Sequence, residues 1–245
     1  IFKGSKYIEK NFEDDKNNIV SKYNQSGYRD ARIIGDSIYR IDDKNIGILI
    51  KLDEGNKYYF RDINWVGNTK YDTTLLNKVL GIKKGDVYNK ELLQTNLTYN
   101  EGGYDISSIY MDDGYLFFNV NPVEVRVEND SIDLEIRMYE GDQATIGKVS
   151  VKGNTKTNDH VVVREMYTKP GQLFSRSDVI RTTRELAALG YFNAETLNPN
   201  IQPDPTDGTV DIEYVVEETS SDQIELSAGW GYNSLILTLG LTLNN

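Results

Sequence analysis

The chain has 245 residues, of which 38% are hydrophobic and 27% charged, and its formal net charge is −11. This balance is typical of a folded chain, and the negative charge argues against binding to nucleic acid, which needs a basic surface. There is no cysteine, which excludes disulfides and thiolate metal sites. No apolar run reaches 18 residues, so no transmembrane helix is predicted.

Residues 1–56 predict an incomplete repeat unit. A helix is expected near 12–26, followed by strands 31–40 and 45–52. The opening strand found in the two later units is missing here, and no signal peptide is visible. We therefore expect the sequence to be a fragment of a longer protein, with this first unit truncated at its N-terminus.

Residues 57–141 predict a complete unit of two helices and three strands. Turn residues Gly-Asn-Thr follow the first strand at 67–69, and the stretch KKGDVY, with a glycine before an aromatic residue, precedes the second helix. Residues 98–108 are an insertion relative to the next unit, and Gly102-Gly103 is expected to break the helix there. The expected elements are strand 60–66, helix 73–80, a helix from Asn89, and strands 115–127 and 131–139.

Residues 142–220 repeat the same order. Gly-Asn-Thr recurs at 153–155, after the alternating run 145–151. A first helix is expected to start at Thr157 or Asn158 and continue to Tyr167, and Ser175 or Ser177 is expected to cap a second helix. Strands are then expected at about 192–201 and 209–216.

The spacing of shared landmarks indicates that these segments are copies of one unit. Each contains Gly-Tyr before a strand and an acidic residue at the end of its last strand. The distance between the two landmarks is 27, 26 and 27 residues in the three copies. Such constancy is typical of repeat proteins. The landmarks are Gly27, Gly114 and Gly190, and Glu54, Glu140 and Glu217.

Residues 221–245 break the pattern and predict a β-hairpin. Two runs alternate apolar and polar or small residues around the turn residues 231–234. One face of the second run consists of leucine, which a lipid-facing strand of a membrane barrel would explain. The alternative is an ordinary hairpin packed on a repeat unit. In the barrel interpretation the membrane-facing residues are Ile224, Leu226, Trp230, Leu235, Leu237, Leu239 and Leu241.

The repeated β-α-α-β-β order resembles the POTRA domain. The resemblance depends on Gly-Asn-Thr after the first strand, the stretches KKGDVY and KPGQLF, the Gly-Tyr pairs and the acidic strand end. Tandem units followed by an amphipathic hairpin are similar to the BamA family of outer-membrane β-barrel assembly factors. The resemblance implies an α+β fold, with a three-stranded mixed sheet and two helices on one face of it. By analogy residues 1–56, 57–141 and 142–220 are the third, fourth and fifth units, and 221–245 is the first hairpin of the barrel.

The resemblance also implies a scaffold rather than an enzyme, without cofactor or metal. It would lie on the periplasmic side of the bacterial outer membrane, attached to lipid through its barrel. It would receive unfolded outer-membrane proteins for membrane insertion and dock partner lipoproteins, for which the 98–108 insertion is a candidate contact. An exposed sheet edge can pair with almost any extended chain. The family's sheet order leaves the second strand at an edge, and the residues expected there are Ile33, Ile34, Phe117, Phe118, Asn119, Leu197 and Asn198.

Two other functions stay open. One is a related translocation pore of the TamA-like, two-partner secretion or organelle import kind, and the other is a non-enzymatic adhesion or binding repeat protein. Catalysis has little support, because His160 is the only histidine and no Gly-x-Ser-x-Gly stretch is present. The acidic runs lack the spacing of a calcium-binding loop.

Overall fold

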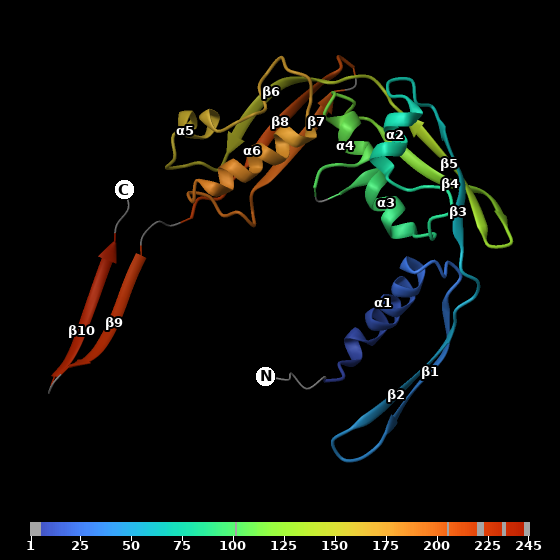
Figure 1. Ribbon diagram of the computed structural model, residues 1–245. Coiled ribbons are helices and arrows are strands. Elements are labelled where there is room, and N and C mark those ends of the chain that lie inside the picture. The colour runs from blue at the N-terminus through green and yellow to red at the C-terminus, as the bar shows by residue number, and fades with distance from the viewer. Residues whose placement is uncertain (1–5, 101, 205, 220–222, 232–233, 243–245) are drawn as a thin grey trace. The chain divides into compact units, whose positions relative to one another are not determined.

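The computed structural model describes residues 6–100, 102–204, 206–219, 223–231 and 234–242 (Figure 1). The chain divides into two compact bodies. The N-terminal body comprises residues 1–110 and 117–141, and the C-terminal body comprises 111–116 and 142–245.

The N-terminal body begins with one helix and a hairpin. The short 3-10 helix η1 (Glu9–Asn11) leads into α1 (Phe12–Gln25), and β1 (Arg32–Arg40) pairs antiparallel with β2 (Ile46–Asp53). These bounds agree with the predicted helix and strands. A two-stranded sheet has little surface to bury, and large side chains such as Ile38 and Ile48, which are Cα partners, remain exposed.

The second unit of the N-terminal body contains a three-stranded mixed sheet. Its strands are β3 (Tyr59–Val66), β4 (Asn119–Glu128) and β5 (Ser131–Tyr139). β5 is central, parallel to β3 and antiparallel to β4. Alternate residues of β5 face the helices and are buried, as a half-covered sheet requires. They are Ile132, Leu134, Ile136 and Met138.

Two capped helices pack on this sheet. α2 (Thr73–Leu80) begins after Asp72, whose carboxylate accepts the Leu75 N–H at 2.8 Å. α3 (Lys90–Thr98) begins after Asn89, whose side-chain oxygen accepts the Leu92 N–H at 2.9 Å. Such caps satisfy donors that the first helical turn leaves unpaired. The bounds of α2 and the predicted start of a helix at Asn89 agree with the structure, in which Asn89 is the N-cap.

The insertion is only partly a loop. Helix α3 ends near the predicted break, but the chain forms a further helix, α4 (Ile106–Met111), in which Ile106, Ser107 and Tyr110 are buried. Asp105 is fully buried, and its carboxylate accepts the N–H of Ser108 at 2.9 Å and its hydroxyl at 2.7 Å. The second half of the insertion therefore belongs to the core.

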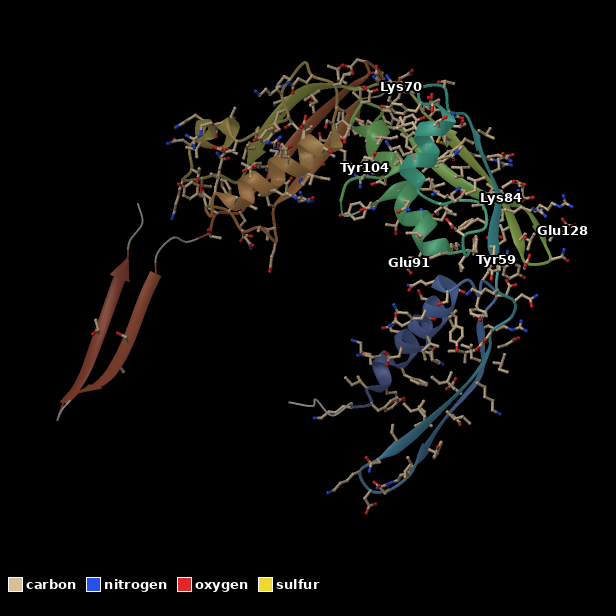
Figure 2. The ribbon with its side chains drawn as sticks, in the orientation of Figure 1. Tyr59, Lys70, Lys84, Glu91, Tyr104 and Glu128 are labelled. Carbon is tan, nitrogen blue, oxygen red and sulfur yellow. The ribbon has the colours of Figure 1, made fainter. Side chains whose placement is uncertain are left out.

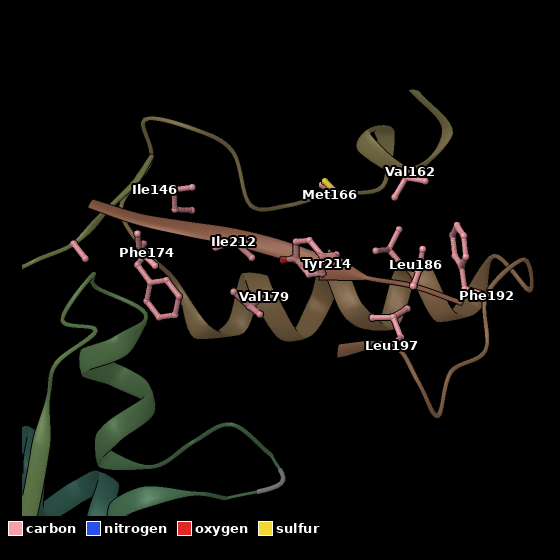
Figure 3. Close-up of a cluster of buried hydrophobic side chains, with 13 residues drawn as sticks. Ile146, Val162, Met166, Phe174, Val179, Leu186, Phe192, Leu197, Ile212 and Tyr214 are labelled. Carbon is pink, nitrogen blue, oxygen red and sulfur yellow. The ribbon is translucent and has the colours of Figure 1, made fainter. Parts of the chain in front are cut away.

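The C-terminal body repeats the sheet order. β8 (Thr209–Val215) lies between β6 (Thr145–Lys152), which is parallel to it, and β7 (Asn198–Asp204), which is antiparallel. Helix α6 (Arg176–Ala188) lies along the sheet, and buried side chains from both fill the space between them (Figure 3). The largest of these include Phe174, Leu186, Ile212 and Tyr214.

Helix α5 (Asp159–Arg164) is shorter than predicted. It ends before Tyr167, because the Tyr167 N–H donates to the Thr182 hydroxyl of α6 at 2.9 Å instead of continuing the helix. Met166, just after the helix, is buried in the core.

The second strands begin later than predicted. β4 starts at Asn119 rather than at 115, and β7 at Asn198 rather than near 192. The preceding residues form turns: the Leu116 N–H donates to Gly114 O, and the Thr196 N–H donates to Asn193 O. The apolar residues of these turns pack in the core. Their sequence pattern therefore resembles that of a half-buried strand.

The tail forms the predicted hairpin. β9 (Gln223–Gly231) and β10 (Ser234–Thr242) are antiparallel, and Leu235 is the Cα partner of Trp230. The side chains of Ile224, Leu226, Trp230, Leu235, Leu237, Leu239 and Leu241 lie outside the described residues, so their contact with lipid stays a prediction. Among the helices that the structure describes, none combines the length and apolarity needed to cross a membrane.

Candidate binding edges of the sheets

Each three-stranded sheet leaves two strands with one side that no other described strand covers. These are β3 and β4 in the N-terminal body and β6 and β7 in the C-terminal body. The second strand of each complete unit therefore lies at an edge, as the resemblance implies. Unpaired backbone groups at such an edge can bind an extended chain.

The Gly-Asn-Thr turns follow the first strand of each unit and pack against the end of its last strand. A Cβ atom at Gly67 would collide with the carbonyl oxygen of Met138, and one at Gly153 with that of Val216. Both glycines also have positive φ, 91° and 105°. Only glycine satisfies both requirements, which explains why the phrase recurs.

The acidic strand ends bind these turns. The Glu218 carboxylate accepts the Thr157 N–H at 2.6 Å, the Thr155 hydroxyl at 2.8 Å and the Lys156 N–H at 2.9 Å. These hydrogen bonds, above all the one from Thr157, lower the pKa of Glu218 to about 2.

Glu140 binds the turn of its own unit, residues 57–141, in the same way. Its carboxylate accepts the N–H groups of Thr69 at 2.8 Å and Lys70 at 3.0 Å. Burial acts to raise the pKa of Glu140, but these bonds hold it below its usual value. The repeated turn and carboxylate therefore serve the fold rather than a catalytic site.

The stretches KKGDVY and KPGQLF cover the beginning of each first strand. In the C-terminal body the Ile146 N–H donates to Gln172 O, and the Gly171 N–H donates to Ile146 O, both at 2.7 Å. In the N-terminal body the Phe60 N–H donates to Asp86 O at 2.9 Å, and the Gly85 N–H donates to Phe60 O at 2.7 Å. The edges of β3 and β6 are therefore closed at their N-terminal ends.

The seven residues predicted to lie at the edges differ in exposure and in position relative to the strands. Ile33 is half-buried in β1, and Ile34 lies at a β-bulge and is 62% exposed. Phe117 precedes β4 and is 37% exposed. Asn119 and Asn198 are exposed and begin β4 and β7.

Two of the seven are core residues. Phe118 is 6% exposed and stacks on the Tyr110 ring, with centroids 4.1 Å apart, and Leu197 is 8% exposed. Both side chains pack in the core, so pairing at these positions would involve their backbone groups. Proline marks these edge strands better in the sequence, at Pro122 in β4 and at Pro199 and Pro203 in β7. Proline has no N–H to donate to a neighbouring strand, and within sheets it is therefore found mainly in edge strands.

The two units of the N-terminal body are joined by a charged network. Arg29 donates to the Glu124 carboxylate at 2.6 Å, and the Tyr88 hydroxyl donates to the same carboxylate at 2.5 Å. Burial, with the hydrogen bond to Glu124, raises the pKa of Tyr88. The network lines a cavity of about 600 Å³ together with Leu93 and Pro122.

The C-terminal body has a cavity of its own, of about 720 Å³. Its walls mix acidic and basic side chains, among them Asp112, Arg164, Lys169 and Asp178. Within the stretches of chain that the structure describes, no group of three or more His, Asp or Glu residues is placed to hold a metal ion.

Comparison with known proteins assigns a family to both complete units. The family model POTRA, "Surface antigen variable number repeat", matches residues 58–141 and 144–219. BamA of Neisseria meningitidis serogroup B, an outer membrane protein assembly factor, is 26% identical over 258 residues, covering 100% of this chain and 30% of that protein. BamA of Neorickettsia risticii is 26% identical, covering 92% of this chain and 29% of that protein.

A solved structure shares the fold. The crystal structure of Haemophilus influenzae BamA POTRA3-5 has a TM-score of 0.68 and 23% sequence identity, and the match covers 88% of this chain and 83% of that one. The chain spans about 30% of the length of the two BamA relatives.

Proposed function

This chain belongs to the POTRA family, and from this we propose that it is the periplasmic scaffold of a BamA-like machine that assembles outer-membrane proteins. It receives unfolded barrel proteins by pairing with them at its sheet edges, and it docks assembly lipoproteins. The terminal hairpin belongs to a barrel that holds the scaffold at the outer membrane. The likeness to two BamA proteins supports this role.

One observation carries the proposal of edge pairing. Both complete units place a strand at each side of a three-stranded sheet, with no second described strand beyond it. Backbone pairing there depends little on the sequence of the guest, which suits a receiver of many different barrel proteins. The guest itself must be extended and unfolded, because a closed barrel has no free edge.

Site-specific photo-crosslinking tests this role. A benzophenone side chain is placed at Val127 of β4 or Lys148 of β6, both exposed, and at exposed Arg184 of α6 as the control. The full chain is mixed with an outer-membrane barrel protein, either freshly diluted from urea or folded in detergent. We expect adducts at Val127 and Lys148 with the unfolded protein alone. Equal adducts at all three positions, or none, would contradict edge pairing.

Lipoprotein docking is tested at the exposed side of the insertion. Tyr104 is 58% exposed and lies on the loop before α4 (Figure 2). Deleting residues 98–108 would remove core side chains, so Tyr104→Ala is the better variant. Tyr139→Ala, at an exposed position of β5, is the matched control. We expect Tyr104→Ala to weaken binding of purified assembly lipoproteins by about tenfold, the usual loss at an aromatic contact. Unchanged binding would remove this loop from the interface.

A further inference from the structure

We propose that the edge of the C-terminal body that receives an extended guest chain is the first strand of the unit, β6, and not the second strand, β7. This inference rests on the proposed function and names the site at which it acts. The guest is an extended segment of an unfolded outer-membrane barrel protein. The assignment depends on which backbone N–H groups of each edge strand point away from the sheet.

The hydrogen bonds of β6 fix the direction of its amides. The Thr145 N–H donates to Gly208 O at 3.0 Å, and Lys152 O accepts the Val216 N–H at 2.8 Å, so both residues face the central strand β8. A strand residue directs its N–H and C=O to the same side, and successive residues alternate. The register shifts between Ile146 and Val149. The backbone groups of Val149 and Val151 therefore point outward.

In β7, prolines occupy most of the positions that point outward. The residues of β8 that face β6 are the even-numbered ones, so Asp211 and Glu213 face β7. Their partners Gln202 and Asn200 face inward. The outward positions of β7 are consequently Pro199, Ile201 and Pro203. Two of these three residues have no N–H, so a guest strand would find a single donor along this edge.

The edge of β6 already accepts main-chain pairing within the protein. Residues 171–174 pair with its N-terminal end: Thr145 and Leu173 form an antiparallel bridge, and the Phe174 N–H donates to Ala144 O at 2.9 Å. Beyond this covered end, β6 contains no proline and its residues are exposed or half-buried. An extended guest continues the same line of pairing onto Val149 and Val151. The sealing of β7 by proline is a common way to protect an edge.

Hydrogen exchange of the unmodified chain tests the assignment. The ¹⁵N-labelled 245-residue chain is mixed with a barrel protein diluted from urea, and amide exchange is followed residue by residue. We expect exchange at Val149 and Val151 to slow by about tenfold or more, with no change at Ile201. Protection at Ile201 without protection at Val149 and Val151 would overturn the inference. If the barrel protein does not bind the chain at all, the proposed function fails as well.

A pair of proline variants gives an independent measurement. Val151→Pro removes one outward N–H from β6, and Ile201→Pro removes the remaining outward N–H from β7. Neither change deletes a hydrogen bond to β8, so circular dichroism should show both variants folded. We expect Val151→Pro to weaken binding of the unfolded barrel protein about fivefold, as the loss of one hydrogen bond does, and Ile201→Pro to leave it unchanged. The reverse order of effects would assign the site to β7.

Discussion

At the scale of single residues, the repeated landmarks act through backbone geometry and charge. In each complete unit one carboxylate, Glu140 or Glu218, accepts several donors from the turn after the first strand. The glycine of that turn lies where a side chain would meet a carbonyl oxygen. The turn glycines and Glu140 can be recognised from the sequence by their spacing. In the last unit the carboxylate that binds the turn is Glu218 rather than the landmark Glu217, and this becomes clear only from the hydrogen bonds.

The stability of the chain should depend on the ionisation of Glu218. Its pKa in the folded state, about 2, lies below the ordinary value of 4.5. The ionised carboxylate therefore stabilises the fold above about pH 4.5, and this stabilisation is lost as the pH falls from about 4.5 to about 2. Glu218→Gln should lower the denaturant midpoint at pH 7 and differ progressively less from the unmodified chain toward pH 2. Glu217→Gln, at an exposed neighbour, is the control. A pH-independent difference between Glu218→Gln and the unmodified chain would rule out this linkage.

The turn glycines should differ from loop glycines in their tolerance of alanine. Gly171 has a φ of 83°, but a Cβ atom added there would meet no other atom within 4 Å, whereas Gly153 combines its positive φ with the collision at Val216. Gly171→Ala should cost roughly 1 kcal/mol of unfolding free energy, and Gly153→Ala roughly 3 kcal/mol or more. Urea denaturation measures both. Equal losses would show that the collision is relieved by a small backbone shift.

At the scale of elements, local rules predicted the helices better than the strands. The bounds of α2 and the caps at Asn89 and Ser175 follow from residues within a few positions of the helix start. The starts of β4 and β7 depend on which apolar residues pack in the core. Phe118 and Leu197, just before these strands, are buried there. The outward direction of β6 amides depends on a bulge against a distant strand. Such pairing between distant segments cannot be predicted from a short stretch of sequence.

Helix α6 has a second capping residue, Asp112, which was not predicted from the sequence. Ser175 Oγ accepts the Asp178 N–H at 3.2 Å, as predicted for a cap, but Asp112 also accepts the Ser177 N–H at 2.7 Å and its hydroxyl at 2.6 Å. Asp112 carries a negative charge at the helix N-terminus, which adds to the stabilisation. Asp112→Ala should lower the unfolding free energy by about 1–2 kcal/mol, and Ser175→Ala by about 0.5–1 kcal/mol.

Thermal denaturation of both variants checks this order. Asp142→Ala, at an exposed acidic residue of the same body, is the matched control for loss of an acidic side chain. A larger effect for Ser175→Ala than for Asp112→Ala would show that the local cap dominates.

At the scale of the whole molecule, the repeats were predicted well from the sequence, because spacing is independent of local conformation. Both complete units have the same sheet order and the same parallel pairing of first and last strands. What joins consecutive units was not predicted. In the N-terminal body the Arg29–Glu124–Tyr88 network connects the first unit to the second, and its members lie 36 to 95 residues apart.

Breaking that network should destabilise the N-terminal body. The Arg29 and Glu124 side chains are 33% and 25% exposed, whereas the pair Arg32–Asp53 is far more exposed. Glu124→Gln should therefore cost about 1–3 kcal/mol, as charged hydrogen bonds do, and Asp53→Asn about 0–1 kcal/mol, as surface ion pairs do. Hydrogen exchange in α1 and α3 measures the effect locally. Identical exchange in both variants would mean that the network contributes no more than a surface pair.

The hairpin should control association of the chain. Its alternating leucines predict an apolar face, and a lone two-stranded ribbon cannot bury such a face by itself. The full chain should form oligomers or bind detergent, whereas a version ending at Thr219 should be a monomer. Thr219 is retained because its N–H donates to Tyr191 O at 2.9 Å. Light scattering without detergent gives both masses, and two monomers would contradict the expected apolar face.

In the proposed pairing at β6, the loop that covers the beginning of this strand also limits the length of guest chain that can bind. The uncovered stretch runs from Gly147 to Lys152, roughly 20 Å at about 3.3 Å per residue. A strand that crosses an outer membrane has about 9–11 residues, so roughly a third or more of it stays unpaired while the rest is docked. In the proposed pairing, a guest strand therefore keeps part of its length free to pair with its own neighbouring segments.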